Sequence, residues 1–307
     1  MAGILRDDDI DFAAHMRDTD CKAKVRSATA YEADLLQEFI ERPKGERPPT
    51  MFSSRLRHMF EFRPGEVTVW AGYNGHRKSM FVGQVMAELC VQRQRCLVAS
   101  FEMSPGRTLA RMAKQTFGMQ DPGPSSLRHF AKWTDNRLWL FDHMGRISTD
   151  QMLAVCQYLA DKLQGQHVLI DSMQFVCASE ENLDEQKQFM TDIVRFGQET
   201  GVHMHVVVHC RKPLNETQVP TKYDIRGSAA ISDQAHNVIT VWADKAKKDK
   251  LLSDPHNEAL LAKPDAAVTI EKQRNSHFEG RLKYWFDELS FRFTDERTTP
   301  IEPWVLD

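Results

Sequence analysis

Residues 65–79, which read GEVTVWAGYNGHRKS, carry the pattern that decides the fold. Apolar residues alternate with period two in the first half and predict a β-strand, and two glycines then predict a tight loop. Lys78 and Ser79 begin a segment with apolar residues at helical spacing through Leu89. A strand, a glycine-bearing loop and a helix in this order are the setting of a phosphate-binding loop.

Such a loop binds nucleotide phosphates through backbone N–H groups and a helix N-terminus. Lys78 adds positive charge, and the Ser79 hydroxyl is a ligand for Mg²⁺. One position departs from the pattern, because Arg77 stands where the pattern has glycine before the lysine. Either the loop accommodates Arg77 and uses its charge on phosphate, or nucleotide affinity is reduced. The predicted nucleotide-binding residues here are Gly72, Asn74, Gly75, His76, Arg77, Lys78 and Ser79.

Composition limits the classes of protein to which the chain can belong. Its 307 residues include 40 basic and 43 acidic side chains, a formal net charge of -3, so any polyanion site is a local patch. The six cysteines lack metal-ligand spacing and predict buried free thiols in a reducing compartment. The N-terminus has no apolar core, and no run of about 18 apolar residues occurs. We expect a cytoplasmic protein without a membrane partner.

Three parts are predicted along the chain. Residues 1–28 are polar and form a flexible arm, 29–50 form a helix and a proline-rich linker, and 51–307 form one large α/β domain. In the second part, Thr29 and Glu32 have the spacing of a capping box. A stripe of Leu35, Leu36, Phe39 and Ile40 follows before Pro43 stops the helix. This stripe needs a surface to pack on, in its own domain or in a neighbouring copy.

The large domain alternates strands and helices, which predicts a mostly parallel sheet covered on both faces. Strands are expected near 66–71, 95–101, 137–142, 167–171, 204–209, 236–242 and 267–272. Helices are expected near 79–92, 105–117, 148–163 and 183–199. Residues 281–293 predict a β-hairpin that turns at Asp287 and Glu288.

Two carboxylates follow predicted strands. Glu102 comes directly after the second strand, where it could polarise an attacking water or merely favour the N-terminus of the next helix. Asp171 ends an apolar strand about ninety residues after the loop, where a carboxylate helps to hold Mg²⁺ beside phosphates. Taken alone, each pattern is common in α/β proteins.

Polar and basic residues gather in the second half of the large domain. His209 ends a strand and could sense the γ-phosphate of a bound nucleotide. Basic side chains and exposed N–H groups at a Gly-Ser turn suit a nucleic-acid backbone, although a solvated loop is the simpler interpretation. Lys272 and Arg274 share one face of a strand end, where they either reach a neighbour's active site or form surface ion pairs. The predicted nucleic-acid-binding residues are Arg211, Lys212, Lys222, Arg226, Gly227 and Ser228.

This chain resembles the ATPase domain of the ring-shaped replicative helicases in six segments, GYNGHRKS, SFEMS, HVLIDS, VVVHCRKP, YDIRGSAAI and IEKQRN, followed by the closing hairpin. The group includes the DnaB type, the helicase half of the phage primase-helicases and the mitochondrial Twinkle helicase. The match runs in consistent order over roughly residues 55–295. The chain lacks the zinc-binding, primase or globular N-terminal domains of these groups, and so resembles a stand-alone phage or prophage core.

The resemblance implies a RecA-like phosphate-loop ATPase that uses ATP or another NTP with Mg²⁺. It implies Lys78 and Ser79 as phosphate and Mg²⁺ ligands, Glu102 as catalytic base and Asp171 as support for the metal. It implies His209 as the γ-phosphate sensor and the basic loop as the site of single-stranded DNA. Arg274, with Lys272 beside it, would act on the ATP of the next subunit in a ring. An aromatic residue among Tyr284 to Phe286, assigned to Phe286, would stack on the base.

The resemblance further implies a hexameric ring that moves 5′ to 3′ on single-stranded DNA and unwinds duplex DNA in replication, with a primase or helicase loader as partner. The helix near 29–41 would dock on the neighbouring subunit. Two alternatives stay open. One is a RecA-like recombination or regulatory ATPase that does not unwind DNA, and the other is a DNA-binding homologue whose nucleotide site is impaired by Arg77.

Overall fold

The computed structural model describes residues 27–33, 36, 49–56, 59–177, 182–213, 215 and 217–307. The chain divides into two compact units, Met1–Arg47 and Pro48–Asp307. In the first unit a short 3-10 helix, η2, spans Ala28–Tyr31. Ser27 is its N-cap residue and Thr29 lies inside the turn, so the predicted capping box is wrong. The predicted positions Leu35, Phe39, Ile40 and Pro43 lie outside the described residues.

The second unit is built on a nine-stranded mixed sheet with the order β3-β2-β4-β5-β1-β6-β7-β8-β9. Six strands are parallel: β3 (Leu138–Leu140), β2 (Cys96–Ser100), β4 (His167–Asp171), β5 (His203–His209), β1 (Val67–Gly72) and β6 (Asn237–Ala243). Three more extend the sheet in antiparallel fashion: β7 (Ala266–Gln273), β8 (Gly280–Asp287) and β9 (Arg292–Thr294). The predicted α/β class is therefore confirmed.

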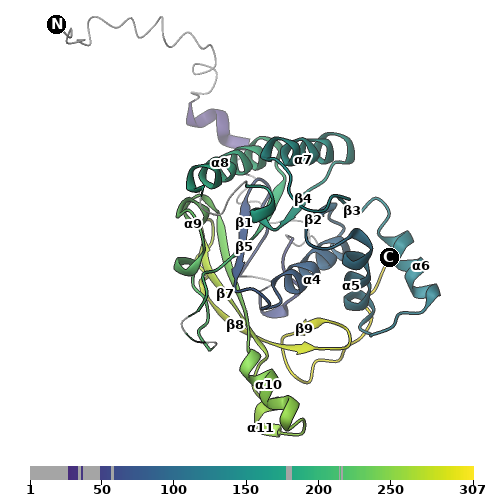
Figure 1. The fold of residues 1–307 in the computed structure, drawn as a ribbon. Helices are drawn as coiled ribbons and strands as arrows, with labels where there is room; N and C mark the ends of the chain where they lie inside the picture. Colours follow the sequence, from purple (N-terminus) through teal and green to yellow (C-terminus); the bar gives the residue numbers. More distant parts are fainter. Residues whose placement is uncertain are drawn as a thin grey trace, which may run out of the picture. The chain divides into compact units, whose positions relative to one another are not determined.

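Helices cover both faces of the sheet (Figure 1). The four that the apolar periodicity predicts are α4 (Lys78–Val91), α5 (Pro105–Phe117), α7 (Thr149–Leu163) and α8 (Leu183–Thr200). One apolar core joins α4 and α5 to the sheet and contains Trp70, and the other joins α7 and α8 and contains Val67 and Val69. Alternate residues of β1 therefore enter opposite cores, and the whole strand is buried.

Four further helices were not predicted, namely α6 (Pro124–Trp133), α9 (Ala230–Gln234), α10 (Lys245–Ser253) and α11 (Glu258–Leu261). Two of them have only four or five residues, too few to show a helical period. Helix α10 reads KAKKDKLLS, so its charges leave no apolar stripe to detect. Three short 3-10 helices complete the described structure: η3 (Ser54–Leu56), η4 (Met173–Phe175) and η5 (Lys222–Asp224).

The C-terminal hairpin is confirmed, but its turn is longer than predicted. Strand β8 continues through Asp287, which pairs with Arg292 of β9, so residues 288–291 make the connection. The Asp287 carboxylate accepts a hydrogen bond from the Ser290 N–H at 2.7 Å. This bond fixes the turn and places Phe286 and Glu288 beside the phosphate-binding loop.

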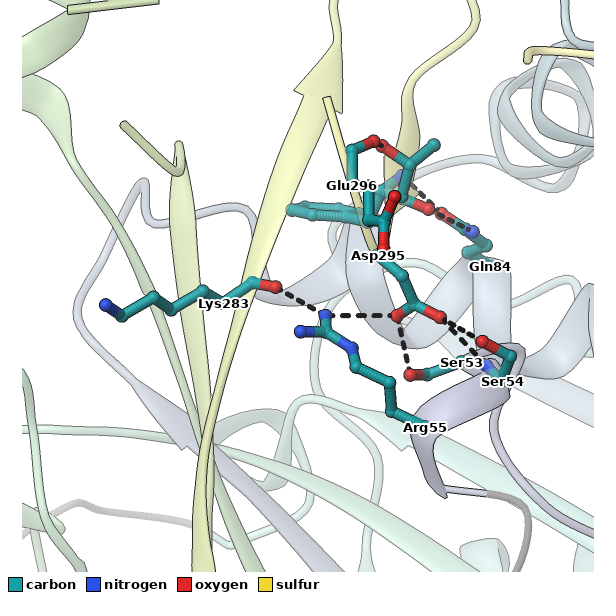
Figure 2. A network of polar contacts seen from close by, with 9 residues as sticks. Ser53, Ser54, Arg55, Gln84, Lys283, Asp295 and Glu296 are labelled. Carbon is teal, nitrogen blue, oxygen red and sulfur yellow. Dashed lines mark hydrogen bonds and ion pairs between the residues drawn. The ribbon is translucent and has the colours of Figure 1, made fainter. Parts of the chain in front are cut away.

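Asp295, just beyond β9, ties the start of the second unit to the hairpin (Figure 2). Its carboxylate accepts hydrogen bonds from the Ser53 hydroxyl at 2.6 Å and the Ser54 N–H at 2.9 Å, and pairs with Arg55 at 3.1 Å. Arg55 also donates to the Lys283 carbonyl at 2.6 Å. These donors hold the pKa of Asp295 below its usual value despite its burial.

The five cysteines in the described part of the chain are free and buried, as predicted, and Cys21 lies outside it. Within the described ranges, none of the helices combines the length and the apolar character needed to cross a membrane.

Candidate functional site

The carboxyl ends of β1, β2, β4 and β5 meet at one edge of the sheet, because these strands are parallel neighbours. A cavity of about 370 Å³ opens there, which we call the phosphate cavity. Its lining includes Lys78 and Ser79 from the start of α4, together with Glu102, Asp171 and His209 from three strand ends. Residues that are up to 131 positions apart in the sequence therefore face one space.

The backbone of the loop explains where glycine is needed. A Cβ on Gly72 would lie 2.3 Å from the carbonyl oxygen of Val241, so any side chain there would clash with β6. Gly75 has φ +73°, in the left-handed region. Arg77, the N-cap residue of α4, has φ 61° and ψ 22°, also left-handed. The glycine that the pattern expects before the lysine is thus a conformational requirement, which Arg77 meets with strain.

The Arg77 side chain contacts the C-terminal hairpin. Its guanidinium donates to a carboxylate oxygen of Glu288 at 2.6 Å and lies over the Phe286 ring, 3.9 Å from the centroid. Lys248 of α10 also pairs with Glu288, at 3.1 Å. The charge of Arg77 is therefore compensated by Glu288, and its side chain links the loop to the hairpin.

Lys78 is buried and folds back on its own loop. Its ammonium donates to the carbonyl oxygens of Gly72 and Tyr73, both at 2.9 Å, and lies 3.2 Å from Nδ1 of His209. Burial lowers the pKa of Lys78 to about 8. At neutral pH the group is still mostly charged, so a phosphate oxygen can replace the carbonyl partners.

Asp171 and Ser79 form the oxygen pair that suits a divalent cation. The two side chains are hydrogen-bonded, and Asp171 is buried at the end of β4. Burial, together with the nearby Glu102 carboxylate, raises the pKa of Asp171 to about 6. Mg²⁺ is typically held by one or two protein oxygens together with substrate phosphates, so this small donor set fits it. No cluster of three or more His, Cys, Asp or Glu occurs in the described residues.

Glu102 and His209 complete the lining. Glu102 is exposed to the cavity and accepts a hydrogen bond from the Gln174 amide at 3.1 Å. Burial, with the positive charges of Lys78 and Arg226, lowers the pKa of His209 to about 4. His209 is therefore neutral at physiological pH. In the described structure its Nε2 is buried without a hydrogen-bond partner.

A second cavity of about 580 Å³, which we call the basic cavity, adjoins the first and shares His209, Asn74 and Gln174 with it. Its cationic lining residues are Arg211, Lys212, Arg226 and Lys245. The His209 carbonyl accepts a hydrogen bond from the Arg226 N–H at 2.9 Å. The end of β5 is therefore bonded directly to the predicted nucleic-acid loop.

The other predicted members of that loop are placed differently. Gly227 has φ +107°, and a Cβ there would lie 2.2 Å from the Gln186 amide oxygen. That oxygen accepts the Ser228 N–H at 2.8 Å, so the expectation of an exposed N–H is wrong for Ser228. Lys222 donates to the Glu271 carbonyl at 3.4 Å and does not line the basic cavity.

His76 is buried against β6 rather than in the phosphate cavity. Its Nδ1 accepts the Ala243 N–H at 3.2 Å, and burial lowers its pKa to about 4. The neutral imidazole thus anchors the loop to the neighbouring strand.

Lys272 and Arg274 lie at the opposite edge of the sheet. Strand β7 runs antiparallel to β6 and ends where β6 begins, so eight residues, roughly 20 Å, separate its two ends. Both side chains donate to the Asp233 carbonyl at 2.9 Å, and Arg274 is exposed. Neither residue can reach the phosphate cavity of its own chain.

Comparison with known proteins identifies the family. Residues 52–214, more than half of the chain, match the AAA domain family. This chain belongs to the AAA domain family. A DNA helicase/primase of Enterobacteria phage T3 is 26% identical over 200 residues, which are 58% of this AAA domain protein and 35% of the relative. The chain thus spans about a third of the length of that relative.

Solved structures share the fold of this AAA domain. One of them, an isolated ATPase domain, matches with a TM-score of 0.71 and 16% identity, over 88% of this chain and 98% of that one. A DnaB-like replicative helicase, studied with its interactions with primase, matches with a TM-score of 0.71 and 15% identity, over 89% and 69%. The resemblance to DnaB-like helicase ATPase domains is confirmed.

Three residues of the AAA domain's site were not predicted from the sequence. Arg111 of α5 and Gln174 line the phosphate cavity, and the Lys245 ammonium donates to the Asn74 carbonyl at 3.2 Å. Burial lowers the pKa of Arg111, and the charge of Asp171 opposes this shift. Arg111 follows Glu102 by nine residues on an amphipathic helix, a position that the helical period could have flagged.

Proposed function

We propose that this AAA domain is an ATP-dependent DNA helicase motor that assembles into a hexameric ring, moves 5′ to 3′ on single-stranded DNA and unwinds duplex DNA in replication. The observation that carries the proposal is the continuity of two cavities through His209. The phosphate cavity holds the groups that ATP hydrolysis needs, and the basic cavity holds cations suited to a DNA backbone. A change at one can reach the other through a single strand end.

The roles of the phosphate-cavity residues follow from their chemistry. Lys78 and the loop N–H groups bind the phosphates of ATP, and Glu102 orients and deprotonates the attacking water. Ser79 and Asp171 would hold Mg²⁺, which supplies positive charge against the phosphate oxygens. Arg111 adds charge from α5. These groups come from four elements whose relative positions are fixed by the sheet.

Arg274 completes the site of a neighbouring subunit in this proposal. Its distance from its own phosphate cavity and its exposure support action in trans, and a guanidinium can stabilise charge on the γ-phosphate. Lys272, which shares the Asp233 carbonyl, holds the strand end in place. The segment 29–50 would join subunits, and the arm 1–28 would precede it.

DNA movement would be driven through the loop that follows β5. When the γ-phosphate leaves, Lys78 returns to His209, and the His209 carbonyl shifts the backbone at Arg226. Arg211, Lys212 and Arg226 carry the bound strand with the loop. We further propose that the protein works in a bacterial cytoplasm with a primase or a helicase loader, in line with the named relatives.

The test is ATP hydrolysis with and without single-stranded DNA, for wild type and Lys78→Ala. We expect DNA-stimulated turnover in wild type and none in Lys78→Ala, with Lys250→Ala, an exposed residue of α10, as the matched control. Strand displacement from 5′-tailed and 3′-tailed duplexes then tests direction. Turnover without DNA stimulation would contradict the motor function. A filament instead of a six-membered ring in electron microscopy with an ATP analogue would favour a RecA-like ATPase that does not unwind.

A further inference from the structure

The aromatic residue predicted to stack on the nucleotide base has a covered face. The Phe286 ring packs among other rings of the hairpin, 4.8 Å from Phe293 and 6.4 Å from Phe291 between centroids. The guanidinium of Arg77 lies over it at 3.9 Å, which is a stacking distance. A base cannot occupy this face of Phe286 while Arg77 is in place.

Arg77 stands at the boundary of two cavities. It lines the phosphate cavity and also a cavity of about 590 Å³, the hairpin cavity, which is lined by Leu251, Leu252, Trp285 and Phe286 among others. A nucleotide has a charged phosphate end and a flat apolar base joined by a ribose. The two cavities offer the matching surroundings on the two sides of one arginine.

The guanidinium is held as a rigid plane. Phe286 supports its face, and Glu288 fixes its edge with a 2.6 Å ion pair, leaving the Arg77 side chain 16% exposed. A guanidinium is planar and weakly hydrated and stacks on π systems, whereas an ammonium group does not stack. The left-handed backbone of Arg77 starts this side chain one residue before the phosphate-binding Lys78.

We propose that the Arg77 guanidinium is the platform on which the base of the bound nucleotide stacks, with Phe286 and Glu288 as positioning residues behind it. This inference rests on the proposed nucleotide-binding function. It replaces direct stacking on Phe286 with a layered arrangement of base, guanidinium and ring. Stacking on a cation selects flat aromatic rings rather than one base, so all four nucleoside triphosphates should bind, purines more tightly than pyrimidines.

The experiment compares the binding of ATP with the binding of inorganic tripolyphosphate, which has the phosphates but no base. Both are titrated calorimetrically with Mg²⁺ into wild type, Arg77→Lys and Arg77→Gly. We expect each substitution to weaken ATP binding roughly tenfold, the scale of one stacking contact, while tripolyphosphate binding changes less than about twofold. Phe286→Leu should show part of the same selective loss. Arg195→Lys, at an exposed position of α8, is the matched control.

Two results would overturn the platform. ATP binding that is unchanged or tighter in Arg77→Gly would mean that the side chain does not support the base or obstructs it. An equal loss of ATP and tripolyphosphate would place its effect on the phosphates or the loop. Wild type that shows the selective pattern without DNA-stimulated turnover would refute the motor function and leave the platform standing.

Discussion

The ammonium group of Lys78 lies 3.2 Å from Nδ1 of His209. This contact joins the phosphate-binding loop after β1 to the end of β5, the neighbouring strand. The pKa of His209, lowered to about 4, keeps the imidazole neutral, so Nδ1 can accept a hydrogen bond from Lys78. A phosphate that draws Lys78 away therefore changes the hydrogen bonding of a strand end that is bonded to the DNA-binding loop.

His209→Gln should uncouple ATP hydrolysis from DNA. The amide can occupy the site but does not reproduce the ring geometry between Lys78 and the loop. We expect the stimulation of hydrolysis by single-stranded DNA to fall roughly tenfold or more, a typical coupling between two sites, while ATP affinity changes little. Steady-state hydrolysis with and without DNA measures the effect. His256→Gln, on an exposed residue, is the control, and unchanged stimulation in His209→Gln would exclude a sensor role.

Arg274→Ala should abolish hydrolysis and leave nucleotide binding largely intact, because the arginine lies far from the phosphate cavity of its own chain. The decisive form mixes two inactive variants. Lys78→Ala subunits still carry Arg274, and Arg274→Ala subunits still carry an intact phosphate cavity. Mixed rings should therefore regain a fraction of wild-type hydrolysis.

The control for the mixing experiment is Arg281→Ala, which removes an exposed arginine of the adjacent strand β8. This variant should hydrolyse ATP like wild type. Mixtures that remain as inactive as their two components would show that Arg274 does not act across a subunit boundary.

The sequence predicted the sheet well because its strands are short apolar runs between helices of clear period. Strand β4 and helix α5 begin and end at the predicted residues. The polar residues at strand ends were also predictable, since parallel strands bring their carboxyl ends to one edge. Glu102, Asp171 and His209 therefore face one cavity, as their positions in the chain suggested.

The remaining features depend on contacts between distant segments. The bonding of Arg77 to Phe286 and Glu288 spans more than two hundred residues, and no local pattern predicts it. Lys245 reaches the loop from α10, whose charged sequence hides the helix. The Ser228 N–H is taken by Gln186 of α8, a side chain with no motif of its own.

The basic cavity gives a prediction about salt. Arg211 and Lys212 are exposed and line it, so each should neutralise one DNA phosphate. Arg211→Gln should weaken binding to all single-stranded sequences similarly and reduce the slope of log K against log salt by about 0.7. Fluorescence anisotropy at several salt concentrations measures this slope. Lys250→Gln should leave it unchanged, and an unchanged slope in Arg211→Gln would remove Arg211 from the DNA site.

Three buried histidines at the other edge of the sheet predict acid lability. Nδ1 of His205 accepts from the Trp70 indole at 3.2 Å, and its Nε2 lies 3.2 Å from Nδ1 of His167. Nε2 of His203 lies 2.8 Å from the Thr68 hydroxyl. Burial lowers the pKa of all three, for His203 to about 4, although a nearby glutamate opposes the shift there.

The sign of the pH dependence follows from these directions. An unfolded histidine titrates near pH 6.5, so below that pH the unfolded state binds protons that the folded state refuses. Their stabilisation is full above about pH 6.5 and is lost as the pH falls through the folded pKa, at about 1.4 kcal/mol per pH unit for each histidine. Asp171, whose pKa is raised to about 6, has the opposite sign and offsets one of the three between about pH 4 and 6.

Urea unfolding at pH 7.5, 6.5, 5.5 and 4.5 tests this prediction. The free energy of unfolding should fall steeply below pH 6.5, and His205→Gln should reduce the steepness by about one proton whatever its effect on stability at pH 7.5. The comparison uses the slope because a buried glutamine can change the absolute stability through packing alone. His256→Gln, which is exposed, should leave the slope as in wild type. A His205→Gln slope equal to that of wild type would mean that this imidazole stays neutral in the unfolded state as well or is charged in the fold.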